Sequence, residues 1–247
     1  MKKLYYIGII ICLCIILLCL FMILKELYER KTDIENFERV REVAMTPLSE
    51  EQLNASVSVE YEGEDSKRPK INLLALQNTN SDCAAWLFVE GTNISYPVMH
   101  TPDESEKYIY KNFYGDKSSS GTPFLDGRCT LDSENLIIYG HNMKNGTMFG
   151  GLKKYLEKDY FERHNEIELI TNSKATVYKV FAVVRVKDTD DWYSYIDECK
   201  NEIISCIKEK STYHTDIEVT EKSKFITLST CYGKDKSDRL LLIGIAE

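Results

Sequence analysis

A cysteine and an arginine lie close together near the C-terminal end of the sequence, in the stretch TLSTCYGKDKSDRLLLIGI. Cys231 ends one apolar run, seven mostly polar residues follow, and Arg239 begins the next apolar run. A cysteine thiolate is a nucleophile that a nearby cation favours, and an arginine offers a planar fork of donors for an oxyanion or a substrate carbonyl. If residues 225–231 and 239–246 pair as an antiparallel hairpin, the two side chains face each other at its mouth. An arginine that only solvates a strand end fits the spacing equally well.

A cysteine nucleophile also needs a proton carrier, and the chain has four histidines. His164 and His214 lie in charged or connecting segments, so we expect them at the surface. His141 ends the run NLIIYGH and His100 follows ISYPVM, which places each of them at the end of an expected strand. Imidazole titrates near neutral pH and can serve as both acid and base. We favour His141 modestly over His100 for this role.

The segments that must position these residues have the composition and spacing of β-strands. From Trp86 onward, short runs rich in Val, Ile, Tyr and Phe alternate with turn residues, which predicts an all-β barrel or sandwich. Residues 190–210, DDWYSYIDECKNEIISCIKEK, break this pattern because their apolar positions step by three or four. We expect an amphipathic helix there, with Cys199 and Cys206 on its apolar face.

The N-terminal segment differs from the rest of the chain. Residues 4–24 carry no charge and are long enough to span a bilayer core of roughly 30 Å. Because the run is long and lacks a small-residue cleavage pattern, we expect an uncleaved signal anchor rather than a cleaved signal peptide. The lysines at positions 2 and 3 favour a cytoplasmic N-terminus. Residues 25–45 have helical periodicity, residues 46–69 resemble a polar linker, and residues 70–78 predict a short helix.

Composition and missing motifs exclude several function classes. The formal net charge of −8 gives no basic face for a nucleic-acid partner. The sequence has no G-x-S-x-G elbow, no H-E-x-x-H, no Walker A loop and no G-x-G-x-x-G motif. No Cys/His cluster has zinc-ligand spacing, so we expect neither a metal nor a cofactor. For the cysteines other than Cys231, a buried and inert role is the better interpretation.

Four segments together resemble one known family. TLSTC followed by RLLLIGI resembles the active-site cysteine and arginine strands of sortases. NLIIYGHNMKNGTMFGGLKKY is similar to the histidine segment of class B sortases, and GTNISYPVM and GTPFLDGR resemble two further class B segments. The helical insertion before TLSTC also matches that class. The resemblance covers roughly residues 70–247, although His100 stands where class B chains often carry glutamine and could shift substrate preference.

The resemblance implies a mainly β fold, an eight-stranded sortase-type barrel with N-terminal helices and a long helix inserted before the cysteine strand. It implies a cysteine transpeptidase on the outer face of a Gram-positive cell membrane. Cys231 would attack the threonine carbonyl of a sorting motif like Asn-Pro-Gln-Thr-Asn in a surface protein. His141 would protonate the leaving amine and later deprotonate an incoming peptidoglycan-precursor amine, while Arg239 would steady the substrate or the oxyanion. Ser229 and Thr230 would shape the cleft, or their hydroxyls would only satisfy a strand end.

The expected domain organisation follows from these segments. Residues 1–3 would be a cytoplasmic tail, residues 4–24 a transmembrane anchor, residues 25–69 a juxtamembrane helix and linker, and residues 70–247 an extracellular catalytic domain. Two alternatives stay open at the level of the sequence. A membrane-anchored cysteine peptidase that passes its acyl group to water would use the same three residues. A catalytically inactive adhesion or scaffold domain is the other alternative, and the complete Cys, His and Arg set argues against it.

Overall fold

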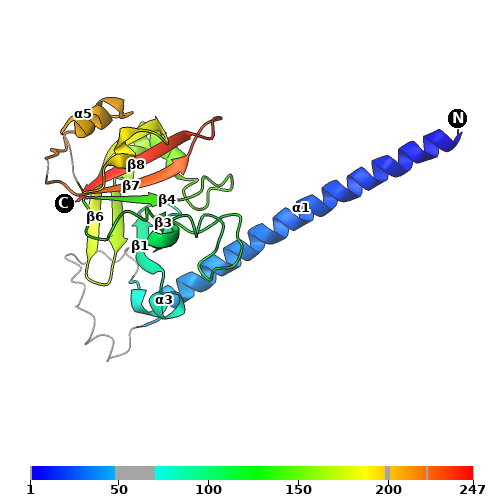
Figure 1. Cartoon of the computed structure of the whole chain (residues 1–247), viewed down its shortest axis with the longest axis horizontal. Helices are drawn as coiled ribbons and strands as arrows, with labels where there is room; N and C mark the ends of the chain where they lie inside the picture. The colour runs from blue at the N-terminus through cyan, green and yellow to red at the C-terminus, as the bar shows by residue number, and fades with distance from the viewer. Residues whose placement is uncertain (1, 48–69, 198–200, 221, 247) are drawn as a thin grey trace.

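The structure is a computed structural model that describes residues 2–47, 70–197, 201–220 and 222–246. A long helix leads away from a β-barrel with short helices around it (Figure 1). Within the described residues, eight strands form a closed barrel in the order β1-β2-β3-β4-β7-β8-β6-β5, which confirms the predicted architecture. The strands are β1 (Cys83–Val89), β2 (Ser95–Met99), β3 (Phe124–Leu125), β4 (Asn135–Tyr139), β5 (Glu166–Ile170), β6 (Ala175–Lys187), β7 (Phe225–Cys231) and β8 (Asp238–Ala246).

Short helices lie before and between the strands. They are α3 (Leu73–Thr79), η1 (Pro102–Glu104), η2 (Leu152–Leu156), α4 (Lys158–Arg163), η3 (Asp191–Ser194) and α5 (Asn201–Lys210). The main core fills the barrel with Val, Ile and Leu side chains from the strands, together with Trp192 and Phe225. A second apolar cluster lies between the N-terminal helices and the outer face of β1 and contains Trp86, Tyr108 and Phe113. Burying these aromatic and branched side chains supplies most of the driving force for the fold.

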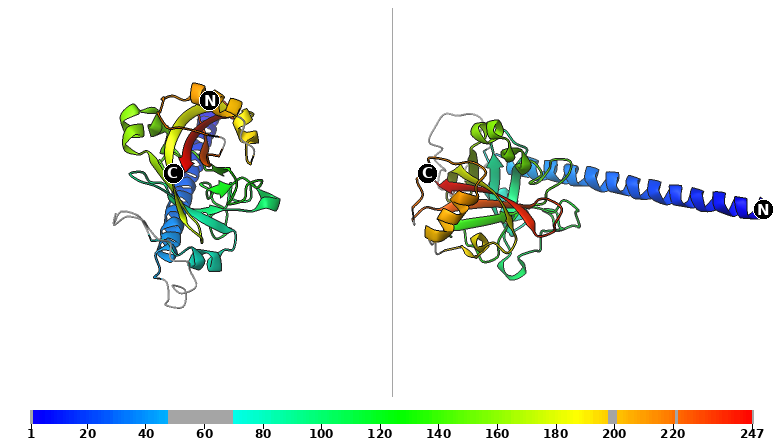
Figure 2. Two further views of the ribbon diagram at one scale, coloured as in Figure 1. Left: turned by 90° about the vertical axis from the view of Figure 1, so that its left-hand side faces the viewer. Right: turned by 90° about the horizontal axis from the view of Figure 1, so that it is seen from above.

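The helix α1 (Lys2–Ala44) is continuous from the apolar N-terminal run into the charged segment after it. Its first part is fully exposed and is long and apolar enough to cross a membrane, a property that anchors and signal sequences share. Its last turns pack against the barrel and α3, as the views in Figure 2 also show. The buried face contains Asp33, Asn36, Val40 and Ala44. Ile34, which is next to Asp33 in the sequence, is exposed.

The prediction of one helix over residues 190–210 is wrong in its extent. The described part contains a short 3-10 helix, η3, an extended residue Tyr195, and then α5. The cause is Asn135 of β4, whose side-chain and backbone nitrogens donate to the carbonyls of Tyr195 and Ile196. Those carbonyls therefore accept hydrogen bonds from the barrel instead of from backbone N–H groups farther along a helix, and the helix is interrupted there.

The cysteines of this segment also differ from expectation. Cys206 is exposed, because α5 buries Ile204 and Ile207 instead of the face that carries the cysteine. The prediction that Cys206 lies on an apolar face is therefore wrong. Cys199 and the linker residues 48–69 lie outside the described residues.

Candidate active site

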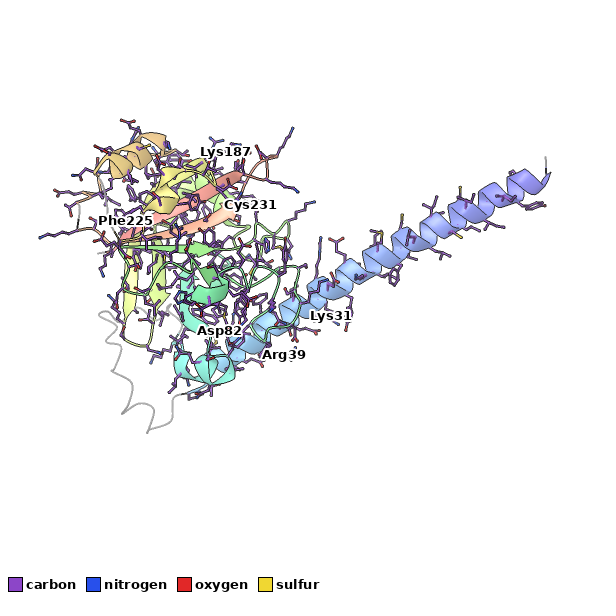
Figure 3. All side chains as sticks on the ribbon, viewed as in Figure 1. Lys31, Arg39, Asp82, Lys187, Phe225 and Cys231 are labelled. Atoms are coloured by element: carbon purple, nitrogen blue, oxygen red, sulfur yellow. The ribbon has the colours of Figure 1, made fainter. Side chains whose placement is uncertain are left out.

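A cleft of about 840 Å³ opens at the barrel end where β4 and β7 finish and β8 begins. Cys231, His141 and Arg239 all line it, so the structure brings together the three side chains that the sequence singled out. Figure 3 labels Cys231 and Phe225 at opposite ends of β7, with Cys231 at the end near Lys187. A strand end at a barrel rim is a usual place for a site, because loops there leave a concave surface.

Cys231 is the last residue of β7 and the first one of that strand to be exposed, after six buried residues. Its carbonyl accepts a hydrogen bond from the side-chain nitrogen of Asn142 at 2.8 Å. The strand pairing places Cys231 directly opposite Arg239 on β8, which confirms the predicted hairpin. The thiol is thus presented to the cleft by a strand whose other residues are fixed in the core.

Arg239 is held by three hydrogen bonds at the start of β8. Its Nη1 donates to the carbonyl of Lys236 at 2.5 Å and to that of Asp238 at 3.0 Å. Its Nη2 donates to Oδ2 of Asp188, 3.1 Å away, and the guanidinium side chain is only 20% exposed. The guanidinium group is therefore fixed at the cleft wall, by the carbonyls of its own hairpin loop and by Asp188.

His141 reaches the cleft from β4, which runs parallel to β7 with Tyr139 opposite Ser229. The two strands stay joined past their ends, because Gly140 N donates to the Ser229 carbonyl at 3.1 Å. Nε2 of His141 lies 2.7 Å from the carbonyl oxygen of Ile109. The imidazole also packs against the ring of Tyr110, with 5.4 Å between centroids. These contacts fix the ring within the cleft wall.

The other histidines do not line this cleft. His100 lies just after β2 and is partly buried, and burial lowers its pKa. His164 follows α4 and packs against Tyr160, with 4.4 Å between ring centroids. The structure therefore places His141, and not His100, in the same cleft as Cys231.

Ser229 and Thr230 are buried and line the cleft. Ser229 Oγ lies 2.8 Å from the Tyr193 hydroxyl, and Thr230 Oγ1 donates to the Gly140 carbonyl at 2.7 Å. Both expectations for these hydroxyls thus describe part of the geometry: they form the cleft wall, and they pair with neighbouring groups there.

Sequence reasoning missed a polar group that also lines the cleft. Asp126 accepts two hydrogen bonds from the Arg128 guanidinium group, at 2.8 and 2.9 Å, and one from the Tyr139 hydroxyl at 2.9 Å. The Tyr139 ring stacks on Tyr193, and burial raises the pKa of Tyr193 to about 12. Asp126 and Arg128 lie in GTPFLDGR, and their spacing alone gives no signal that they line the same cleft as His141 and Cys231.

The remaining cysteines of the barrel are chemically different from Cys231. Burial raises the pKa of Cys83 to about 12 and that of Cys129 to about 11. A thiol with such a pKa is a poor nucleophile near neutral pH, because little thiolate forms. In the described part of the chain, no group of three or more His, Cys, Asp or Glu side chains could hold a metal ion.

Comparisons with known proteins identify sequences and folds similar to this chain. The Sortase domain family matches residues 87–246. Sortase B of Listeria monocytogenes is 32% identical over 169 residues, which are 63% of this chain and 65% of that protein, slightly less than two thirds of its length. Sortase B of Staphylococcus aureus is 26% identical over 94% of this chain and 91% of its own. The crystal structure of sortase B from Bacillus anthracis in complex with AAEK1 superposes with a TM-score of 0.72 at 26% identity, covering 89% of this chain and 98% of that one.

Proposed function

Because this chain belongs to the sortase family, we propose that it is a membrane-anchored cysteine transpeptidase. Its substrate would be a surface protein with a C-terminal sorting motif, which it would cleave after threonine and join to a cell-wall amine. The observation that carries the proposal is the cleft that holds Cys231, His141 and Arg239 together, with Cys231 the exposed thiol at the end of a buried strand.

The chemistry follows from the three side chains. The Cys231 thiol gives its proton to His141, and the thiolate attacks the threonine carbonyl carbon. Arg239, whose guanidinium group is fixed at the cleft wall, donates to the oxyanion that forms. His141 then protonates the leaving amine and a thioester remains on Cys231. An incoming amine attacks this thioester, gives its proton to His141 and releases the cysteine.

The polar wall of the cleft supports recognition of a peptide. Asp126, Arg128 and the two stacked tyrosines present donors and acceptors beside an apolar surface that includes Phe124. A small number of fixed polar groups within an apolar cleft is the usual arrangement for orienting a ligand. We propose that this wall, together with Ser229 and Thr230, binds the residues that precede the scissile bond.

The helix α1 supports the membrane anchor. In this proposal residues 1–3 are cytoplasmic, residues 4–24 span the membrane, residues 25–69 connect, and residues 70–247 form an extracellular catalytic domain. The exposed apolar part of α1 has the required length, and an anchor confines the enzyme to the surface where both substrates would be found. Protease added outside intact protoplasts should digest residues beyond 46, and protection of that region would contradict this orientation.

The direct test uses the full chain in detergent micelles with a panel of sorting peptides. Cys231→Ala should abolish cleavage, and His141→Ala should lower kcat by about 10² to 10⁴. Arg239→Lys should lose at least about tenfold, because lysine keeps the charge but not the planar fork. The matched control is Cys206→Ala, which removes another exposed cysteine that lies outside the cleft lining and should leave activity unchanged. Wild-type activity in Cys231→Ala would refute the assignment.

A second arm of the same assay separates transfer from hydrolysis. With a glycine-based amine at millimolar concentration, mass spectrometry should detect mainly the ligated peptide, since thioesters react readily with amines. If only hydrolysed peptide forms with several amine acceptors while cleavage runs at full rate, the protein is a cysteine peptidase instead.

A further inference from the structure

We propose that Gly121 and the carbonyl group of Ile109 position His141, and that Nδ1 is therefore the ring nitrogen that exchanges protons with the substrate. This inference rests on the proposed role of His141 as acid and base. It assigns a role to a backbone group and to a glycine, neither of which touches the reacting atoms.

The first observation is the hydrogen bond at the histidine ring. His141 Nε2 lies 2.7 Å from the Ile109 carbonyl oxygen. A carbonyl oxygen can only accept, so Nε2 must carry the hydrogen when this bond is made. The lone pair of the neutral ring is then on Nδ1. The hydrogen bond therefore selects one tautomer and leaves Nδ1 to accept and donate protons.

The second observation is the segment that supplies the carbonyl. Residues 108–122 fold back on themselves as a hairpin-like loop before β3, here called the 108–122 loop. Thr122 N donates to the Tyr108 carbonyl, Ser118 N to the Tyr110 carbonyl, and Thr122 Oγ1 to the Lys111 carbonyl, each at 3.0 Å. These bonds hold the two arms of the loop together, while the Ile109 carbonyl between them turns to His141.

The same loop also contacts the face of the imidazole. The Tyr110 ring packs against His141 with 5.4 Å between centroids and 34° between planes. Adjacent residues of one loop thus fix the ring at its edge, through the Ile109 carbonyl, and at its face, through Tyr110. A shift of the loop backbone would move both contacts together.

The third observation is the close approach of Gly121. Gly121 has φ +60°, and a Cβ there would lie 2.4 Å from the Ile109 oxygen and 2.8 Å from the Tyr108 oxygen. Such distances are well inside van der Waals contact, so any side chain at 121 must push away the carbonyl that binds His141. Glycine is needed here for space and for its backbone conformation.

The loop also contains a matched control. Gly115 has φ +88°, so an alanine there meets a comparable backbone penalty, but a Cβ at 115 would have nothing within 4 Å. Gly115→Ala therefore strains the same loop without displacing the Ile109 carbonyl. Any difference between the two alanine variants reports on the clash.

In the reaction, the Nε2–H group stays hydrogen-bonded to the Ile109 oxygen, while Nδ1 alternates between its neutral and protonated forms. Nδ1 first takes the proton of the Cys231 thiol and then gives it to the leaving amine as the tetrahedral intermediate collapses to the thioester. When the second amine attacks, Nδ1 takes the amine proton and returns it to the departing Cys231 sulfur. Every proton that Nδ1 takes up is given back within one turnover, so the ring ends in its starting tautomer.

The test reads the tautomer directly in the full chain in detergent micelles. With ¹⁵N-labelled histidine, only four residues contribute to a long-range ¹H–¹⁵N correlation spectrum, and His141→Gln identifies the signal of His141. At a pH where the ring is neutral, we expect the wild-type spectrum to show protonation at Nε2. A wild-type ring protonated at Nδ1 would overturn the proposal, and this result needs no enzymatic activity.

The kinetic arm compares the two glycine variants on a cleaved sorting peptide. Gly121→Ala should lower kcat at least about tenfold, within the range that proton transfer supplies, and leave KM within about twofold. Its His141 signal should lose the pure Nε2–H pattern, whereas Gly115→Ala should keep the wild-type signal and rate. Equal rates and signals in the two variants would overturn the proposal.

The two arms also separate this inference from the proposed function. If no peptide is cleaved by the wild-type chain, the proposed function fails while the spectrum still decides the tautomer. If peptides are cleaved and His141→Ala is inactive but Gly121→Ala matches Gly115→Ala, the proposed function stands and the positioning role is refuted.

Discussion

Thr227 on β7 lies at the centre of a buried hydrogen-bond chain, and its replacement gives a stability change that can be worked from the contacts. Its Oγ1 accepts from the Trp192 indole nitrogen at 2.9 Å and donates to Asn135 Oδ1 at 2.8 Å. All three residues are fully buried. Thr227→Val keeps the shape but leaves an indole N–H and an amide oxygen without this partner. At about 1–3 kcal/mol for each of these two stranded groups, we expect a loss of roughly 2–6 kcal/mol.

The assay is guanidinium unfolding of the full chain in detergent, followed by the fluorescence of Trp86 and Trp192, the two tryptophans of the chain. A loss of this size is a large fraction of the stability of an ordinary domain, so the guanidinium concentration at the unfolding midpoint should fall clearly. Thr227→Ser is the matched control, since it keeps the hydroxyl and removes one methyl group at a cost of about 1 kcal/mol. We reason that the Thr227 hydroxyl holds Trp192 of η3 to the barrel. This is refuted if Thr227→Val lowers the free energy of unfolding by no more than Thr227→Ser does.

Two further predictions concern thiol reactivity and acid stability. In the folded chain, iodoacetamide should modify Cys231 and the exposed Cys206 but spare Cys83, whose burial raises its pKa to about 12, and peptide mass spectrometry would show whether Cys83 reacts as fast. Burial alone would raise the pKa of Asp126, but hydrogen bonds from Arg128 outweigh it and lower that pKa below its ordinary value of 3.8. The carboxylate therefore stabilises the fold above about pH 4 and loses this effect as the pH falls through the lowered pKa. Asp126→Asn should therefore reduce the fall of the unfolding free energy on the acid side of a stability–pH curve. An unchanged fall in that variant would contradict the assignment.

The all-β character of the domain and the pairing of Cys231 with Arg239 could be predicted because local patterns specify them, whereas the choice of a barrel came from the family resemblance. The runs that end at Cys231 and begin at Arg239 are apolar and close in sequence, and such runs form a hairpin whose register places the two residues opposite each other. His141 needed one more step, the assumption that its strand ends at the same rim. The parallel pairing of β4 with β7 brings the end of the strand before His141 next to the end of the strand that carries Cys231, and no short-range sequence pattern encodes this pairing.

The parts that sequence reasoning missed depend on contacts between distant segments. The helix expected over residues 190–210 fails at Tyr195 because Asn135, 60 positions away, takes its carbonyl. The Ile109 carbonyl has no side-chain signature, so its bond to His141 could not be inferred from residue types. A glycine such as Gly121 signals a turn in the sequence, but only the folded loop shows which carbonyl it accommodates.

The helix α1 also supports the 108–122 loop, whose Ile109 carbonyl contacts His141. Ser120 Oγ donates to Asp33 Oδ2 at 2.7 Å, both residues are buried, and Ser120 is the neighbour of Gly121. Figure 3 places Arg39 of the same helix beside the barrel, where its guanidinium group lies over the Tyr114 ring. A proteolytic cut between residues 24 and 33 would release a domain that keeps the hydrogen bond between Ser120 and Asp33. A version that begins at residue 70 would lack this contact between α1 and the loop that carries the Ile109 carbonyl, so removing α1 would change the support behind His141 as well as the proposed membrane anchor.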